Sequence, residues 1–263
     1  MTTLQTTQTP YDDLGTGSTA LLMLPGWCGD RTVFTPTATP LAADHRVVVA
    51  DLRGQGGLLH QTEDFDAARQ VDDLVALADD LALERVVPVA LAHAGWLAIE
   101  LRRRLGAQRV PGIVLVDWMV LGTPPGFTDA LAGLQDAGAW QDVRGALFGM
   151  WTAGVGARAV HDYVASMGEY GFGHWSRAGR EIAAAFAREG TPLDALDRLA
   201  EPCPTLHVYA QPADDGYLAA QQEAAARLDW FHVARLDACS HFPTLEVPGA
   251  VAGHVREFVA GLD

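Results

Sequence analysis

The sequence predicts an α/β fold in which a mostly parallel sheet is flanked by helices and carries an inserted helical cap. Three observations predict it: short strand patterns alternate with helical patterns, the strands are apolar almost without interruption, and the strand rhythm stops near residue 121 and resumes near residue 203. Near-continuous apolar strands are buried on both faces, as in parallel sheets covered by helices. We therefore expect one α/β domain with one insertion.

The first part of the core, residues 1–120, contains four predicted strands. A helical pattern lies between the second and the third of them, at residues 62–83, where apolar residues recur at helical spacing and aspartates occupy the other side. This amphipathic segment is the expected crossover helix between parallel strands. The four strands are Thr19–Trp27, His45–Gly54, Arg85–Ala92 and Gly112–Trp118.

The segment 121–202 has helical patterning, three tryptophans and several glycines, and no convincing strand, so we interpret it as the cap. Strand patterns return at Thr205–Pro212 and Trp230–Asp237, and a closing helix is expected at residues 249–262. The second part of the core is therefore residues 203–263, and the sheet is built from both ends of the chain.

Composition excludes several classes of function. Eighteen basic residues against 33 acidic ones give a net charge of −15, which argues against nucleic acid and anionic membranes as partners. The polar start MTTLQTTQTP has no signal-peptide pattern and no apolar run is long enough to cross a bilayer, so we expect a cytoplasmic protein. Three scattered cysteines predict neither disulfides nor a zinc site, and no cofactor-binding motif is visible.

The stretch VALAHAGWLAIE, residues 89–100, has the pattern of a nucleophile elbow, a sharp turn between a strand and a helix. Its central residue, which would be the nucleophile, is Ala92, so no covalent intermediate can form there. An elbow also supplies backbone N–H groups that bind an oxyanion. Those groups would belong to His93 and Trp27.

The chain order of elbow, acid and histidine is that of an α/β-hydrolase. His241 is the candidate base, and Asp117 or Asp214 is the candidate acid. What remains is a His–Asp dyad that faces an anion-binding pocket. A disabled hydrolase kept as a binding scaffold, or a Ser-to-Ala variant at position 92, is the alternative interpretation of the same residues.

Together these motifs resemble the cofactor-independent dioxygenases of the α/β-hydrolase fold that cleave 3-hydroxy-4(1H)-quinolones. The resemblance runs nearly end to end and rests on the blocks LPGWCGD, PVALAHAGWLAIEL, VLVDWMV, LFGMWTAG, YGFGHWSRAGREI and SHFPTLEVP. PGWC combined with DW and SHFP is more specific than an elbow alone.

The resemblance implies that His241 deprotonates the substrate's 3-hydroxyl and that Asp117 holds its imidazole. The organic anion would react directly with O2, without metal or flavin, to release carbon monoxide and an N-acylanthranilate. The expected partners are a small aromatic heterocycle and O2, and the chain would be a monomer or a weak homo-oligomer. Candidates for the apolar pocket wall are Trp27, Trp96, Trp118, Trp151 and Trp175.

The chain departs from the family pattern at the elbow and in the first loop. The family commonly has a serine flanked by two histidines, where this chain has Leu91, Ala92 and His93, and Gly29 replaces a loop histidine. We therefore expect more apolar substrate contact, which suits a 2-alkyl-3-hydroxy-4-quinolone signal molecule. A hydrolase or lyase without a covalent intermediate, and an inactive ligand-binding homologue, stay as alternatives.

Overall fold

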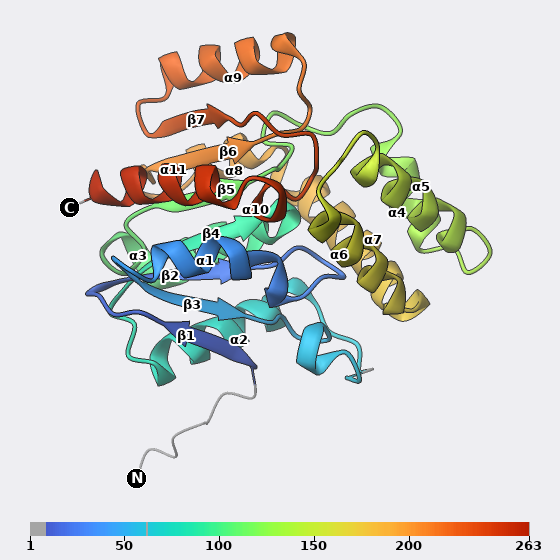
Figure 1. The fold of residues 1–263 in the computed structure, drawn as a ribbon, viewed down its shortest axis with the longest axis horizontal. Helices are drawn as coiled ribbons and strands as arrows, with labels where there is room; N and C mark the ends of the chain where they lie inside the picture. Colours follow the sequence, from blue (N-terminus) through green and yellow to red (C-terminus); the bar gives the residue numbers. More distant parts are fainter. Residues whose placement is uncertain (1–8, 62, 263) are drawn as a thin grey trace.

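The computed structural model describes residues 9–61 and 63–262, and its centre is a seven-stranded sheet (Figure 1). The strand order is β1-β3-β2-β4-β5-β6-β7, and every neighbouring pair is parallel except β1 and β3. This confirms the predicted fold class. The strands are β1 (Tyr11–Leu14), β2 (Thr19–Leu24), β3 (Arg46–Ala50), β4 (Arg85–Leu91), β5 (Ile113–Val116), β6 (Thr205–Tyr209) and β7 (Phe231–Arg235).

Helices cover both faces of the sheet (Figure 1). Helices α1 (Thr35–Leu41) and α11 (Pro248–Ala260) pack together over one face. Helices α2 (Ala67–Asp80) and α3 (Gly95–Arg109) pack together on the other, and α9 (Asp215–Arg227) covers β7. The central strands are buried on both sides, which explains their apolar composition.

The helices between β5 and β6 form a separate layer beyond the carboxyl ends of the strands (Figure 1). They are α4 (Phe127–Leu134), α5 (Trp140–Thr152), α6 (Arg158–Ser166) and α7 (Phe172–Glu189). The last helix of the segment, α8 (Pro192–Asp197), packs against both α7 and α3, and its apolar side chains join the core beside α3. The cap layer therefore consists of α4 to α7.

Two local features differ from the sequence expectation. The edge strand β1 has the sequence YDDL and is exposed throughout, so it carries no apolar signal, and it pairs antiparallel with β3. Helix α2 begins at Ala67, later than the predicted residue 62, because the Asp66 carboxylate caps it by accepting from the Arg69 N–H.

Residue 62 and most of the polar start, residues 1–8, lie outside the described residues. No helix within residues 9–61 and 63–262 is long and apolar enough to cross a membrane.

Candidate active site

Two residues from distant parts of the chain form a dyad at the carboxyl ends of the strands. Asp117 directly follows β5, and His241 lies in the loop between β7 and α10 (Pro243–Glu246). The His241 Nδ1 atom is 2.8 Å from Asp117 Oδ1. Asp117 has φ +47°, a left-handed conformation that aspartate tolerates better than most residues, and 2% of its surface is exposed.

The second carboxylate oxygen of Asp117 is also fully engaged. Oδ2 accepts the N–H groups of Ala210, at 2.8 Å, and Gln211, at 3.0 Å, just beyond β6. An ionised carboxylate can only accept hydrogen bonds, so the proton in the dyad belongs to Nδ1 of His241. The other ring nitrogen, Nε2, is then unprotonated in the neutral imidazole and can act as a base.

Aromatic rings fix the plane of the His241 imidazole. Trp151 from α5 stacks on it, with ring centroids 5.3 Å apart and an interplanar angle of 16°. Phe242 meets it edge to face at 5.2 Å. An indole face also favours a cationic ring, so Trp151 stabilises the imidazolium that forms when His241 takes a proton.

The elbow is present without its nucleophile. Ala92 has φ +50° and is buried at the junction of β4, a short 3-10 turn (Ala92–Ala94) and α3. Glycine is required three residues later, because a Cβ on Gly95 would lie 2.2 Å from the ring of Trp118. The backbone therefore keeps the strained geometry that presents a nucleophile, while the side chain offers only a methyl group.

Two backbone donors flank Ala92. In the described part of the chain, the N–H groups of Trp27 and His93 have no hydrogen-bond partner, and both residues line the cavity beside His241. These are the two N–H groups that the elbow pattern predicts for an oxyanion hole. The turn that carries Trp27 continues into Cys28, which is buried with φ +57°.

The cavity in front of the dyad is small and apolar, with a volume of about 80 Å³. Cap helices α4, α5 and α7 supply eight of its 18 lining residues, α6 supplies Tyr163, and the turn after α6 supplies Met167. Among the described residues, no group of three or more His, Cys, Asp or Glu side chains is placed to hold a metal ion. Its apolar lining residues include Phe127, Leu131, Leu134, Leu147, Trp151, Met167, Trp175 and Ile182.

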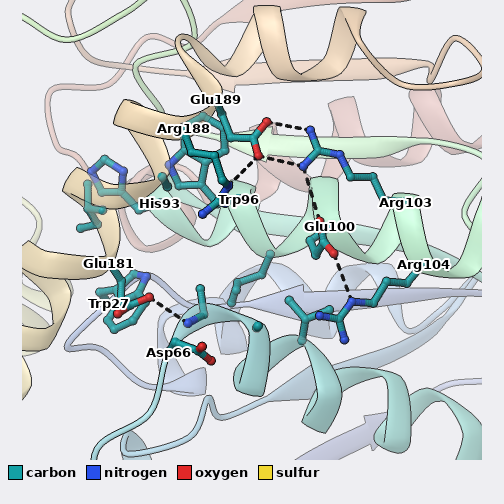
Figure 2. A pocket seen from close by; sticks show the side chains of 16 residues that line it. Trp27, Asp66, His93, Trp96, Glu100, Arg103, Arg104, Glu181, Arg188 and Glu189 are labelled. Carbon is teal, nitrogen blue, oxygen red and sulfur yellow. Dashed lines mark hydrogen bonds and ion pairs between the residues drawn. The ribbon is translucent and has the colours of Figure 1, made fainter.

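A second cleft of about 290 Å³ adjoins this cavity, between α2 and α3 of the core and α7 of the cap. It shares Trp27, His93 and Ile182 with the first cavity. Figure 2 shows charged side chains along one side of it, where Glu189 pairs with Arg103. This ion pair joins the cap to the core at one side of the cleft.

The sequence profile of the Alpha/beta hydrolase family matches residues 21–254. A 2-heptyl-3-hydroxy-4-quinolone dioxygenase of Rhodococcus erythropolis is 36% identical over 237 residues, which are 90% of this chain and 85% of that protein.

The chain belongs to the 3-hydroxy-4-quinolone dioxygenases of the alpha/beta hydrolase family.

Further members of this dioxygenase family agree. The 1H-3-hydroxy-4-oxoquinoline 2,4-dioxygenase of Pseudomonas putida is 33% identical over 240 residues, 91% of this chain and 90% of that protein. A solved structure of a variant dioxygenase bound to its substrate, the Pseudomonas quinolone signal, has a TM-score of 0.93, with 36% identity and coverage of 98% and 97% of the two chains. The resemblance predicted from PGWC, DW and SHFP is confirmed.

The structure separates the predicted site residues into two groups. The cavity in front of His241 is lined by Trp27, Ala92, His93, Trp151 and Trp175. Trp96 lies elsewhere: it extends from α3, packs edge to face on Trp118 and Phe186, and lines the second cleft. Trp96, which the sequence analysis placed in the pocket wall, therefore lies outside the wall of the catalytic cavity.

Trp118 and Asp214 also lie outside this cavity. Trp118 packs behind the elbow against Gly95. Asp214 caps the first turn of α9, where its carboxylate accepts from the Tyr217 N–H at 2.8 Å. The dyad partner of His241 is Asp117.

Sequence reasoning missed the cap tyrosine that occupies the space beside Gly29. A Cβ on Gly29 would lie 2.2 Å from the Tyr163 hydroxyl. That hydroxyl accepts from the Asp30 N–H at 3.0 Å and donates to the Asp30 carbonyl at 3.2 Å. Tyr170 donates to the Gly29 carbonyl in the same way, at 2.9 Å. The glycine thus makes room for this contact between the cap and the core.

Proposed function

We propose that this chain is a cofactor-independent dioxygenase that cleaves the heterocyclic ring of a 2-alkyl-3-hydroxy-4(1H)-quinolone with O2, releasing carbon monoxide and an N-acylanthranilate. The Rhodococcus erythropolis relative is a dioxygenase of 2-heptyl-3-hydroxy-4-quinolone, and the Pseudomonas putida relative is a dioxygenase of 1H-3-hydroxy-4-oxoquinoline. One observation carries the proposal: a His241–Asp117 dyad faces an apolar cavity beside an elbow that has no nucleophile. The groups that remain at this elbow for chemistry are then a base and an anion site.

The dyad performs the first step. His241 takes the proton of the substrate's 3-hydroxyl at Nε2, and the Asp117 carboxylate stabilises the imidazolium through the Nδ1–H bond. A base positioned in this way contributes roughly 10²–10⁴-fold to the rate. The N–H groups of Trp27 and His93 support the proposal because they supply donors for an oxygen of the anion.

The anion is the electron donor in the second step. It reacts with O2 to form a peroxide on the ring, the peroxide attacks the ring carbonyl, and the ring opens with loss of carbon monoxide. Both atoms of O2 enter the N-acylanthranilate, so atoms and electrons balance with one substrate and one O2. Because the substrate itself reduces O2, none of these steps calls for a metal or a flavin.

The apolar lining supports the choice of substrate. The wall of the cavity consists mainly of aliphatic and aromatic side chains, whose apolar character suits contact with a quinolone ring and an alkyl tail. An apolar wall also excludes water, which strengthens the hydrogen bonds that the backbone N–H groups donate and keeps solvent protons from the anion. We place the reaction in the cytoplasm, since the free thiols of Cys28, Cys203 and Cys239 suit a reducing compartment.

The test is to give the purified protein a series of 2-alkyl-3-hydroxy-4-quinolones and follow O2 uptake and carbon monoxide together. The proposal predicts equal amounts of O2 consumed, carbon monoxide released and substrate lost, and no turnover without O2. A hydrolase or lyase would consume the substrate under nitrogen. An inactive binding protein would bind the quinolone saturably and consume nothing.

A further inference from the structure

The second histidine of the cavity, His93, has a hydrogen-bond partner that fixes its protonation. The indole Nε1–H of Trp118 lies 3.1 Å from His93 Nδ1. An indole N–H can only donate, so Nδ1 must accept and carries no proton. In the neutral imidazole the proton is then on Nε2.

The surroundings of His93 keep the ring neutral. Burial, together with a smaller effect of the nearby His241, lowers the pKa of His93 to about 3. Phe127 stacks on the ring, with centroids 5.6 Å apart, and Phe186 meets its edge at 5.9 Å. His93 is therefore uncharged throughout the pH range in which the protein would work.

His93 Nε2 remains available to a ligand. Within the described residues no protein group bonds to this nitrogen, and the residue lines both the catalytic cavity and the adjoining cleft. In Figure 2 His93 lies at the left of the view, away from the ion pair between Glu189 and Arg103. His93 directly follows Ala92 and lines the same cavity as Trp27 and His241.

Trp118 itself is held firmly. Its ring packs on Gly95 and meets Trp96 edge to face at 4.8 Å. Its backbone N–H donates to Nε2 of the buried His207, at 3.2 Å, and its carbonyl accepts from the Tyr217 hydroxyl at 3.3 Å. These contacts aim the indole N–H at His93.

We propose that Trp118 is a positioning residue that fixes His93 as a hydrogen-bond donor to an oxygen of the bound substrate anion. The consecutive residues Asp117 and Trp118 then set opposite tautomers in two histidines of one cavity. The carboxylate leaves His241 with a free lone pair at Nε2, which takes the proton, while the indole leaves His93 with a proton at Nε2, which binds the resulting oxyanion. This role rests on the proposed function only for the identity of the ligand.

The tautomer is tested without substrate, by ¹⁵N NMR of histidine-labelled protein between pH 5 and pH 9. The expected result is a His93 ring that does not titrate and carries its proton on Nε2. The His93→Gln variant identifies the His93 signals by their loss. Trp118→Phe, which lacks the N–H, is expected to give a mixture of tautomers. A proton on Nδ1 of His93 in the parent protein, or titration within this range, would overturn the proposal.

The donor role is tested by binding a 3-hydroxy-4-quinolone without O2, and by turnover in air. His93→Gln can place an amide N–H near the position of Nε2, whereas the shorter His93→Asn cannot, so the two form a matched pair. Loss of a hydrogen bond to a charged group costs about 10- to 100-fold, so His93→Asn should weaken anion binding and kcat/KM by that factor while His93→Gln stays close to the parent. Equal losses in both folded variants would overturn the donor role.

The measurements separate this proposal from the proposed function. If quinolone binds with the predicted difference between the two His93 variants but is not cleaved, the dioxygenase assignment fails and the donor role stands. If quinolone is cleaved and both variants behave alike, the donor role fails and the dioxygenase assignment stands. If quinolone does not bind at all, the proposed function fails, and the ¹⁵N NMR measurement of the His93 tautomer decides whether Trp118 positions His93 as a donor.

Discussion

Asp117→Asn is the substitution that most directly reverses the direction of the hydrogen bond between residue 117 and His241. Two backbone N–H groups, of Ala210 and Gln211, point at one carboxylate oxygen from 2.8 and 3.0 Å. An asparagine must put its carbonyl oxygen there, which turns its NH₂ group toward His241 Nδ1. That nitrogen then has to accept, so the imidazole proton moves to Nε2 and the base is lost.

The expected loss in kcat follows from this change of tautomer. A positioned general base is worth roughly 10²–10⁴-fold, which at 1.36 kcal/mol for each factor of ten is about 3–5 kcal/mol in the activation free energy. The assay is the initial rate of O2 uptake with a 2-alkyl-3-hydroxy-4-quinolone, together with anaerobic binding. Binding should persist, because the substitution leaves the apolar wall intact.

Asp214→Asn is the matched control, since Asp214 is the other acid that the sequence offers and the structure places it on the first turn of α9. We expect its rate to equal that of the parent protein. The reasoning would be refuted if the rate of O2 uptake by Asp117→Asn stayed within about fivefold of the parent rate. It would also be refuted if Asp214→Asn lost as much activity as Asp117→Asn.

Three further predictions concern other residues of the account. His241→Ala should reduce kcat by roughly 10²–10⁴-fold in the same assay, and a rate within a few-fold of the parent would contradict its role as the base. Ala92→Ser should change the rate of quinolone cleavage by less than about tenfold, because no covalent step passes through this position; strong new activity toward a chromogenic ester would instead indicate a disabled hydrolase. Glu189→Gln should lower the free energy of unfolding by about 1–3 kcal/mol at pH 7, measured by urea denaturation. The Arg103 hydrogen bonds lower the pKa of Glu189 from 4.5 to about 2, so this stabilisation is complete above pH 4.5 and is lost as the pH falls toward 2. An effect that is as large at pH 2 as at pH 7 would contradict that origin.

The strand-end residues could be predicted from the sequence because their positions follow from chain order alone. Asp117 and Ala92 come directly after the buried strands β5 and β4, His241 lies in the loop after the edge strand β7, and parallel strands bring their carboxyl ends to one edge of a sheet. Apolar strand patterns are distinctive enough to locate these ends. Asp117 and His241 therefore meet at this edge, where Oδ1 and Nδ1 lie 2.8 Å apart.

The cap side of the cavity could not be predicted in the same way. Trp96 and Trp175 both sit on helices with apolar neighbours, and nothing in the sequence shows that Trp175 lines the catalytic cavity while Trp96 lines the adjoining cleft. The contact of Tyr163 with Asp30 joins residues 133 positions apart. Such contacts depend on how two layers pack, which periodicity along one helix does not encode.

The hydrogen bond between Trp118 and His93 could be predicted from the sequence only in part. The dipeptide DW is visible in the sequence, and so is the histidine of the elbow. Their meeting depends on the side-chain directions at a turn where Asp117 has positive φ and Gly95 leaves room for the indole. The tautomer of His93 therefore becomes apparent only from the coordinates.

The most direct test of the account is a two-step mixing experiment on the parent protein. Substrate is first mixed with the protein under nitrogen while the absorbance of the quinolone anion is followed, and O2 is then added while carbon monoxide is measured. The account predicts that the bound anion forms without O2, persists, and releases carbon monoxide in an equal amount when O2 arrives. Ring cleavage under nitrogen, or O2 addition without carbon monoxide, would contradict it.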